Sequence, residues 1–314
     1  MLQQRRVLIA LGGNAMTTPD GSARPEDQRR AVEAAMGDVA ALVATGTEVV
    51  LTHGNGPQVG NLLVKNEMAA HVVPPVPLDW CGAQTQGTIG FTVASALEAA
   101  LDARGITRFA SAIVTRVRVD ADDPAFTRPS KPIGRYVDAD QAARFTGLGQ
   151  NWEDFGPRGW RRVVPSPEPL EILDAPAVRA LLAAGVVPIA AGGGGIPVVR
   201  EPSGALRGVE AVLDKDRTAA LLARSVYAGS MVIATDVPNA VLHYGTPDAR
   251  PIGRISAAEL ARHAADGHFA GGSMGPKVEA ALRFVAEGGG RAVITALDRL
   301  ADGIAGTAGT VVEP

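Results

Sequence analysis

Residues 47–60 read TEVVLTHGNGPQVG, an apolar run that leads into closely spaced glycines and a proline. The β-branched residues of 47–52 predict a short buried strand, and a helical stretch follows the turn. Residues 6–14 repeat this arrangement, with the apolar run RVLIAL placed directly before Gly12-Gly13-Asn14. Strands that alternate with helices form a mostly parallel sheet with helices on both faces. The sequence therefore predicts an α/β fold.

The same alternation continues along most of the chain. Further strands are expected at 109–115, 186–190, 231–235 and 291–295, and helices at 25–46, 83–104, 169–184, 209–224, 256–266 and 276–287. Residues 118–167 break the pattern, because prolines, glycines, tryptophans and charges crowd together there without a clear period. We interpret this region as an excursion from the main sheet with a small core of its own, built from Phe126, Ile133, Tyr136, Phe145, Trp152, Phe155 and Trp160.

Composition excludes several classes of protein. The chain is 46% hydrophobic and 20% charged, with a net charge of −3, which argues against extended disorder and against a nucleic-acid or membrane surface. No stretch approaches the ~20 apolar residues of a membrane span, and the N-terminus does not resemble a signal peptide. A lone cysteine, Cys81, excludes a disulfide within the chain and is expected to be a buried apolar residue. We therefore expect a cytoplasmic protein.

Glycines gather at the ends of three expected strands: Gly12-Gly13, Gly54-Asn55-Gly56 and Gly192 to Gly195. Ligands of open α/β sheets bind beyond the carboxyl ends of the strands, and glycine lets backbone N–H groups approach an anion. Any one of these loops is explained as well by a structural turn. Three at one sheet edge favour phosphate or another small anion.

The common nucleotide and metal motifs are absent. The sequence contains neither GxxxxGK[ST] nor a GxGxxG after a strand, which argues against P-loop and Rossmann proteins. The five histidines show no zinc-ligand spacing. His263 and His268 are five residues apart, which places them off a shared helical face, so we expect surface or core histidines.

Only four of the 30 basic residues are lysines, a bias that codon usage largely explains. A lysine is nevertheless a compact charge that reaches a single oxygen, which the wide arginine fork does not. Lys215 lies in Asp-Lys-Asp near a helix start, Lys277 follows a Gly/Pro turn, and Lys131 lies in SKPIG; Lys65 is expected on the surface. Phosphoryl transfer depends mainly on positioning and charge stabilisation, and glycine loops with lysines suffice for it. Residue chemistry alone thus predicts an anion-binding α/β protein that handles phosphate.

Long blocks of the sequence resemble carbamate kinases, which have the amino acid kinase fold. The blocks are HGNGPQVG (53–60), PLDWCGAQTQG (77–87), DPAFTRPSKPIG (123–134), GWRRVVPSPEP (159–169), GGGGIPV (192–198), GVEAVLDKD (208–216), ATDVPNAV (234–241) and GHFAGGSMGPKVEAA (267–281). The resemblance implies a three-layer sandwich with a central, mostly parallel sheet, formed by one domain over 1–314. Residues 118–167 would be an inserted, protruding subdomain.

The resemblance also implies residue roles. The catalytic residues would be Lys215 and Lys277, which neutralise the transferring phosphoryl group, Asp216, which orients them, and Lys131, which covers the site. Phosphate and substrate would bind at Gly12, Gly13, Asn14, Gly54, Asn55, Gly193 and Gly194. The nucleotide pocket would be lined by Thr235, Asp236 and Met274. Many members have Asp-Ala-Val-Tyr where this chain has Pro238-Asn239-Ala240-Val241, so Tyr244 is the candidate for packing on adenine.

The implied reaction is ATP + carbamate = ADP + carbamoyl phosphate, with Mg²⁺ as cofactor at ligands that the sequence does not identify. The family is homodimeric, and use towards ATP in arginine (deiminase) breakdown is expected because carbamate is unstable. Two alternatives stay open. One is another amino acid kinase with acetylglutamate, aspartate or a nucleotide as acceptor, and the other is a nucleotide-binding regulatory protein without turnover. The SKPIG block and the 118–167 insertion favour carbamate, and the retained lysines favour an enzyme.

Overall fold

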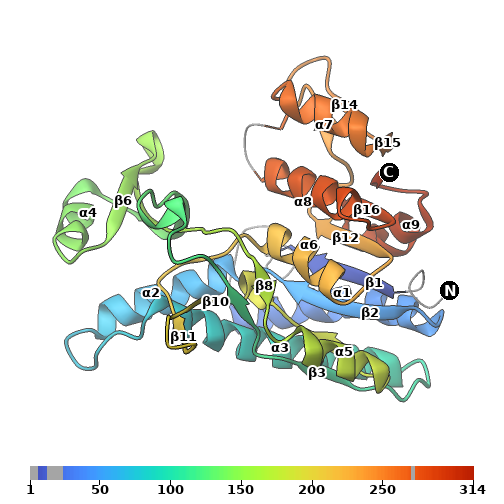
Figure 1. The fold of residues 1–314 in the computed structure, drawn as a ribbon, viewed down its shortest axis with the longest axis horizontal. Coiled ribbons are helices and arrows are strands. Elements are labelled where there is room, and N and C mark those ends of the chain that lie inside the picture. The colour runs from blue at the N-terminus through green and yellow to red at the C-terminus, as the bar shows by residue number, and fades with distance from the viewer. Residues whose placement is uncertain (1–5, 13–23, 270–272) are drawn as a thin grey trace.

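The computed structural model describes residues 6–12, 24–269 and 273–314 (Figure 1). Its centre is an eight-stranded sheet in the order β15-β17-β16-β12-β1-β2-β9-β3. In chain order these strands are β1 (Arg6–Leu11), β2 (Glu48–His53), β3 (Ala110–Ala112), β9 (Val187–Ile189), β12 (Ser230–Thr235), β15 (Arg254–Ser256), β16 (Arg291–Ala296) and β17 (Thr310–Glu313). Every neighbouring pair is parallel except β16 and β17.

Alternate side chains of the central strands enter two separate cores. In β1, Leu8 and Ala10 belong to the core on one face, whereas Val7, Ile9 and Leu11 belong to the core on the other. This alternation follows from the two-residue period of a strand, and burial on both faces explains why the strands are continuously apolar.

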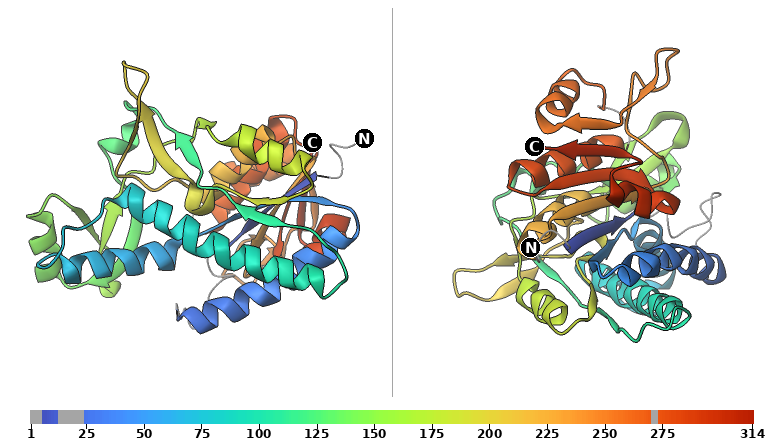
Figure 2. Two further views of the ribbon diagram at one scale, coloured as in Figure 1. Left: turned by 90° about the horizontal axis from the view of Figure 1, so that it is seen from below. Right: turned by 90° about the vertical axis from the view of Figure 1, so that its right-hand side faces the viewer.

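Helices cover both faces of the sheet (Figure 2). One face packs against α1 (Pro25–Ala44), α3 (Leu78–Asp102) and α9 (Leu300–Ala305). The other packs against α5 (Ala175–Ala183), α6 (Lys215–Ser225), α7 (Ala257–Ala265) and α8 (Met274–Ala286). The predicted three-layer α/β sandwich with a mostly parallel sheet is thus confirmed. Within the described residues, no helix is both long enough and apolar enough to cross a membrane.

A second, smaller sheet changes several predicted boundaries. It has the order β11-β10-β4-β8, formed by β4 (Arg116–Arg118), β8 (Glu171–Ile172), β10 (Ile196–Arg200) and β11 (Leu206–Gly208). The strand expected at 109–115 is shorter than predicted: residues 110–112 form β3 of the main sheet, and the chain then leaves this sheet and continues into β4. The helix expected at 169–184 begins only at Ala175, because 171–172 pair with β4 and Asp174 accepts from the backbone N–H of Arg116 at 2.7 Å before α5 begins.

Residues between β4 and β8 include a three-stranded antiparallel sheet, which lies at the left of Figure 1 together with α4 (Ala139–Thr146). Its strands, in the order β5-β7-β6, are β5 (Lys131–Val137), β6 (Asn151–Asp154) and β7 (Trp160–Val164). Phe145 stacks on Trp152, and Tyr136 contacts Phe155 edge to face. Phe126 is an exception to the expected small core. It packs instead against the core on the face of the central sheet that α5 to α8 cover, which we call the main core.

A third apolar cluster joins this small sheet to α2 (Gly56–Ala69) and α3. Ile133 and Val164 from the small sheet pack there against Leu63 of α2 and Leu78 and Cys81 of α3. Cys81 is fully buried, as predicted, and burial raises the pKa of its thiol. The thiol is therefore an apolar packing group rather than a nucleophile.

Candidate active site

The carboxyl ends of β1, β2 and β12 lie side by side at one edge of the central sheet. The Gly12 N–H donates to the Ala234 carbonyl at 2.9 Å, and the Gly54 N–H donates to the Leu11 carbonyl at 3.0 Å. Gly12 and Gly54 therefore follow neighbouring strands, as the parallel arrangement predicts. Gly13 and Asn14 lie outside the described residues.

A cavity of about 320 Å³ lies next to this edge. It is lined by seven of the residues that the sequence singled out: Gly54, Asn55, Lys131, Gly193, Lys215, Asp216 and Lys277. They come from the loop after β2, from β5, from the loop after β9 and from the starts of α6 and α8. A larger hollow of about 650 Å³ lies between α1, α2 and α3, and none of the predicted site residues that the structure describes lines it. Lys65, which is exposed as expected, borders that hollow.

Glycine is required at 192 and 193 because the backbone there packs against the end of β2 and the loop that follows it. A Cβ on Gly192 would lie 2.3 Å from His53 Nε2, and a Cβ on Gly193 would lie 2.2 Å from Asn55 Nδ2. Gly193 also has φ +67°, which side chains rarely adopt. The glycines thus let buried backbone approach the side chain of Asn55, whose amide donates to Thr85 Oγ1 at 2.9 Å.

Asp214 determines where α6 begins. One of its carboxylate oxygens accepts from the backbone N–H groups of Asp216 at 2.9 Å and Arg217 at 3.2 Å, which is the geometry of an N-cap. Residues 209–214 are consequently not helical, so the helix expected from 209 is wrong in its first part. The cap places Lys215 and Asp216 in the first turn of α6, facing the cavity.

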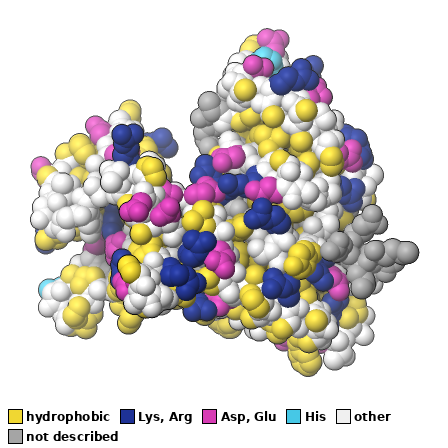
Figure 3. All heavy atoms as spheres, viewed as in Figure 1, with side chains coloured by type: hydrophobic (Ala, Val, Ile, Leu, Met, Phe, Trp, Pro, Cys, Tyr) yellow, Lys and Arg dark blue, Asp and Glu magenta, His cyan; other side chains and the backbone are white. Residues whose placement is uncertain are grey.

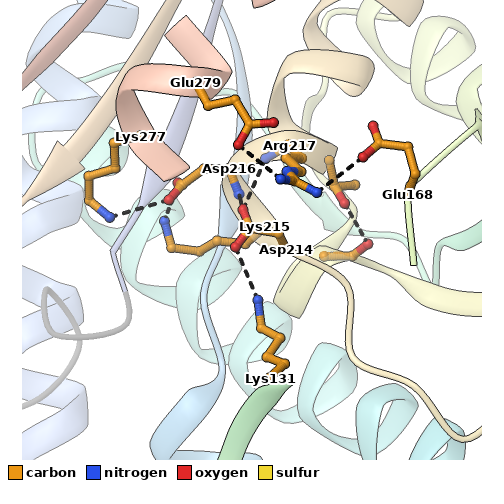
Figure 4. A network of polar contacts seen from close by, with 10 residues as sticks. Lys131, Glu168, Asp214, Lys215, Asp216, Arg217, Lys277 and Glu279 are labelled. Carbon is orange, nitrogen blue, oxygen red and sulfur yellow. Dashed lines mark hydrogen bonds and ion pairs between the residues drawn. The ribbon is translucent and has the colours of Figure 1, made fainter. Parts of the chain in front are cut away.

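Asp216 lies between two lysine ammonium groups (Figure 4). Its Oδ1 lies 2.5 Å from Lys215 Nζ, and its Oδ2 lies 3.2 Å from Lys277 Nζ on α8. The side chains of Asp216 and Lys277 are only 4% and 8% exposed. One buried carboxylate therefore holds two cations at one wall of the cavity, an arrangement with a surplus of positive charge that is poised to bind an anion.

The charge state of Lys215 is set by competing effects. Burial lowers the pKa of its ammonium group, Asp216 opposes this effect, and the neighbouring Lys277 adds to the lowering. An entering phosphate would bring further negative charge and favour the ammonium form. The pair is thus best stabilised when an anion occupies the cavity.

Lys131 reaches the cavity from the opposite side. Its Nζ lies 3.1 Å from the second oxygen of Asp214, so β5 of the small sheet is joined to the start of α6 (Figure 4). Burial alone would raise the pKa of the Asp214 carboxyl, but Lys131 and the two backbone N–H groups outweigh burial and lower it. Asp214 is therefore a carboxylate that both caps α6 and accepts a hydrogen bond from Lys131 of the small sheet.

Comparison with known proteins assigns this chain to a family. The model of the amino acid kinase family matches residues 5–296. The chain belongs to the amino acid kinase family. Carbamate kinase of Thermococcus kodakarensis is 46% identical to it over 98% of this chain and 99% of the relative. Carbamate kinase 2 of Enterococcus faecalis is 44% identical over 97% of each. The predicted resemblance to carbamate kinases is confirmed.

Solved structures show the same relationship. Carbamate kinase from Giardia lamblia bound to AMP-PNP superimposes on this amino acid kinase with a TM-score of 0.93 at 40% identity, covering 100% of this chain and 99% of that one. N-acetylglutamate synthase from Neisseria gonorrhoeae has a TM-score of 0.52 at 17% identity, which shows the fold alone. The relatives and the kinase family together identify the chain as a phosphotransferase.

Among the described residues, the other members of the predicted set do not line the cavity: Gly12, Gly194, Thr235, Asp236, Met274 and Tyr244. The Gly194 carbonyl accepts from Thr218 Oγ1 at 3.0 Å. At the end of β12, Thr235 Oγ1 lies 2.9 Å from Asp236 Oδ1. Met274, the first residue of α8, packs against the main core, and Tyr244 is 81% exposed in the loop after β13 (Val241–Leu242).

Sequence reasoning missed the ion pairs that join the helices of the site. Arg217 of α6 contacts Glu168 at 3.2 Å and Glu279 of α8 at 2.9 Å (Figure 4). Arg283 of α8 also pairs with Glu168. These residues come from three separate segments, and no motif predicts their pairing. Asp214 carried a usable signal, since aspartate is a frequent N-cap and could have marked a helix start at 215 instead of 209.

Basic and acidic side chains also intermingle on the surface that α6 and α8 present, without a large patch of one sign (Figure 3). On this face the positive and negative side chains therefore largely offset one another.

Proposed function

We propose that this protein is a carbamate kinase, which transfers a phosphoryl group reversibly between ATP and carbamate. The observation that carries the proposal is the pairing of Lys215 and Lys277 through Asp216 at the wall of the cavity. Phosphoryl transfer develops negative charge on the equatorial oxygens of the moving group, and fixed cations at that position lower the barrier. Carbamate is proposed as the acceptor because the relatives from Thermococcus and Enterococcus are carbamate kinases.

Each predicted residue has a place in this reaction. Lys215 and Lys277 neutralise the phosphoryl group in transfer, and Asp216 fixes their positions. Gly54 and Asn55 bind the carbamate or carbamoyl end from the opposite wall. Gly12, Gly13, Asn14, Gly193 and Gly194 bind phosphate through the loops after β1 and β9. Lys131 covers the bound substrates from 118–167, which we interpret as a protruding subdomain inserted into the single domain 1–314.

The nucleotide is proposed to bind next to these groups, along Thr235, Asp236 and Met274. The relative from Giardia lamblia was solved with AMP-PNP, which supports an adenine nucleotide as substrate here. Tyr244, being exposed beside the end of β13, is available to pack on the adenine ring.

Mg²⁺ is proposed to enter with the nucleotide as part of the substrate. Mg²⁺ prefers carboxylate and phosphate oxygens and keeps several waters. The two carboxylates among the described lining residues, Asp214 and Asp216, are each engaged by lysine ammonium groups. The donor set of the cavity therefore fits a metal held by phosphate oxygens and water rather than by a protein cage.

Three broader features belong to the same proposal. We expect the protein to be cytoplasmic and homodimeric. We also expect the reaction to run towards ATP in arginine catabolism, because carbamate is unstable. Exposed aromatic groups support self-association: Trp80 and Phe91 of α3 are each 61% exposed. Sedimentation of the purified protein would distinguish a dimer from a monomer.

The activity is tested by incubating the purified protein with carbamoyl phosphate and Mg·ADP and measuring ATP formation. Parallel reactions in the reverse direction offer ATP with carbamate, acetylglutamate, aspartate or UMP. The proposal expects turnover with the carbamoyl pair and at least roughly 100-fold lower kcat/KM for the other acceptors. Turnover of another acceptor alone would assign the site to a different amino acid kinase. Nucleotide binding without any turnover would support the regulatory alternative.

A further inference from the structure

Three of the five histidines lie together outside the cavity, at the C-terminal end of α7. His263 is in the last turn of α7, His268 follows the helix, and His243 follows β13. None of the three lines the cavity that we assign to phosphoryl transfer. Helix α7 lies at the top of Figure 1, beside β14 (Arg250–Pro251).

The way α7 ends explains why two histidines five residues apart meet. Gly267 has φ +83°, its N–H donates to the Ala264 carbonyl at 3.1 Å, and the His268 N–H donates to the His263 carbonyl at 3.2 Å. This pair of bonds is the Schellman arrangement, which reverses the chain at a helix end. The expectation that the five-residue spacing separates the two side chains is wrong, because the helix stops between them. Their ring centroids are 5.5 Å apart.

His243 adds a third imidazole from a different part of the chain. Its ring meets that of His268 edge to face, with centroids 4.4 Å apart. His243 has φ +52°, an uncommon backbone conformation for a residue with a side chain. The N–H and Oγ1 of Thr246 donate to the His243 carbonyl at 3.1 and 2.8 Å, which holds the backbone in this conformation.

Asp266, the C-cap residue of α7, completes a set of possible ligands. One donor atom each from His263, Asp266 and His268 lies within 4.8 Å of the other two. Donors on one zinc ion are each about 2.0–2.2 Å from it and therefore at most about 4.4 Å from one another. Small side-chain rotations that move the donor atoms by a few tenths of an ångström bring all three within this limit of about 4.4 Å. His263 and His268 are half-buried and Asp266 is exposed, so both the ion and its waters have access.

We propose that His263, Asp266 and His268 form a binding site for a late first-row divalent metal ion, with Zn²⁺ as the physiological candidate. Two imidazoles and one carboxylate are ligands that Zn²⁺ accepts, with water in the fourth position, whereas Mg²⁺ requires a shell of oxygens. His243 acts through His268, because its ring packs against that ligand and restricts its orientation. This metal site is separate from the cavity, where Mg²⁺ is proposed to enter with the nucleotide.

The position of the site indicates what metal binding does. Phe269, the residue after His268, is buried in the main core, and the chain then leads to α8, which carries Lys277. A metal that joins the last turn of α7 to His268 would stabilise the chain reversal at Gly267. Because the ligands come together only in the folded chain, the metal raises the unfolding temperature by mass action.

The test uses the tag-free, chelator-stripped full chain without nucleotide, titrated with Co²⁺ as a spectroscopic substitute for Zn²⁺. The proposal expects visible d–d absorption that saturates at about one equivalent, without the thiolate charge-transfer band that Cys81 would give. His263→Ala, His268→Ala and Asp266→Asn should each weaken Co²⁺ binding by roughly tenfold or more. His71→Ala, which removes an exposed histidine at the end of α2, is the matched control and should bind as the wild type does.

A second measurement separates loss of the site from loss of folding. Without Zn²⁺ or Co²⁺, all four variants should unfold near the wild-type temperature and turn over Mg·ADP and carbamoyl phosphate normally, since these side chains are half-buried or exposed and lie outside the cavity. Zn²⁺ should raise the unfolding temperature of the wild type and of His71→Ala, but not of the other three. Equal Co²⁺ uptake by the wild type and His263→Ala, no uptake by the wild type, or equal loss in His71→Ala would each overturn the proposal.

Discussion

Asp216 is the residue on which the proposed chemistry depends, since one carboxylate holds both ammonium groups within 3.2 Å. Its side chain is 4% exposed, so water cannot solvate the two ammonium groups in place of the carboxylate if the carboxylate is removed. A buried charge that loses its partner destabilises a fold much more than a surface pair does. Asp216 is therefore expected to matter for both stability and turnover.

Asp216→Asn keeps the size of the side chain but removes its charge. We expect a loss of about 3 kcal/mol in the free energy of unfolding, because Lys215 and Lys277 are left as unpaired buried cations. Turnover should fall by roughly 100-fold, since the ammonium groups lose their fixed positions. Urea unfolding and initial rates check both. The control is Asp248→Asn on the exposed surface, and a stable, fully active Asp216→Asn protein would contradict the assignment.

His53 predicts a pH dependence of stability that is separate from catalysis. Burial lowers the pKa of its imidazole from 6.5 to about 4. Between these values the unfolded chain binds more protons than the folded one, so the free energy of unfolding rises with pH over this window and falls on acidification. The neutral His53 thus contributes about 3 kcal/mol to the free energy of unfolding, and this contribution is present in full above pH 6.5.

The measurement is urea unfolding at several pH values from about 4 to 7.5 for the wild type and His53→Gln. The variant is expected to be less stable at neutral pH but to lose most of the slope between pH 4 and 6.5. Asp214, whose pKa is lowered, adds its own loss of stability only below its unfolded pKa of about 4. Identical slopes in the two proteins would show that His53 is not buried in its neutral form.

At the scale of elements, the loop after β9 determines how closely the backbone approaches Asn55. Gly193→Ala adds a Cβ that would lie 2.2 Å from Asn55 Nδ2, at a position with φ +67°. We expect the displaced Asn55 to raise KM for carbamoyl phosphate by roughly tenfold, in addition to about 1 kcal/mol of backbone strain.

Gly105 provides a matched control for that substitution. It has φ +70°, but a Cβ there would meet nothing within 4 Å. Gly105→Ala should therefore show the backbone strain alone, with unchanged KM. If both variants shift KM equally, then contact between Gly193 and Asn55 does not position the substrate.

The ion pairs of Glu168 connect helices α6 and α8 near the site. Glu168 contacts Arg217 of α6 and Arg283 of α8, and so fixes the elements that carry Lys215 and Lys277. These side chains are about a third exposed, so Glu168→Gln should change stability by less than about 1 kcal/mol. We expect kcat to fall several-fold with little change in KM, which steady-state kinetics measures. Glu201→Gln, in an exposed pair with Arg207, should leave kcat unchanged; an equal fall in both variants would contradict this role.

At the scale of the whole molecule, the sequence predicts the parts that depend on local pattern. Continuous apolar runs such as 231–235 predict buried strands, and glycines at their ends predict loops at one sheet edge. Lys131, Lys215 and Lys277 could be chosen because lysine is rare here, and the structure brings all three to one cavity. The second sheet escaped prediction because β8 and β11 are two and three residues long, too short for a periodic signal.

Contacts between distant segments also escaped prediction. The Glu168 ion pairs join residues 49 and 115 positions apart, which no spacing rule connects. The histidine cluster was missed for a different reason: a helical period was extended past Gly267, where the chain reverses. Helix ends, rather than helix interiors, are where residue spacing is least informative about which side chains meet.

The most direct test of the central claim is the initial rate of ATP formation from carbamoyl phosphate and Mg·ADP, compared between the wild type and Lys277→Ala. Lys277 is 8% exposed and bound to Asp216, so folding of the variant is checked by circular dichroism and its unfolding temperature. If the paired ammonium groups stabilise the phosphoryl group in transfer, kcat falls by at least roughly 100-fold in the folded variant. An unchanged rate would contradict the account.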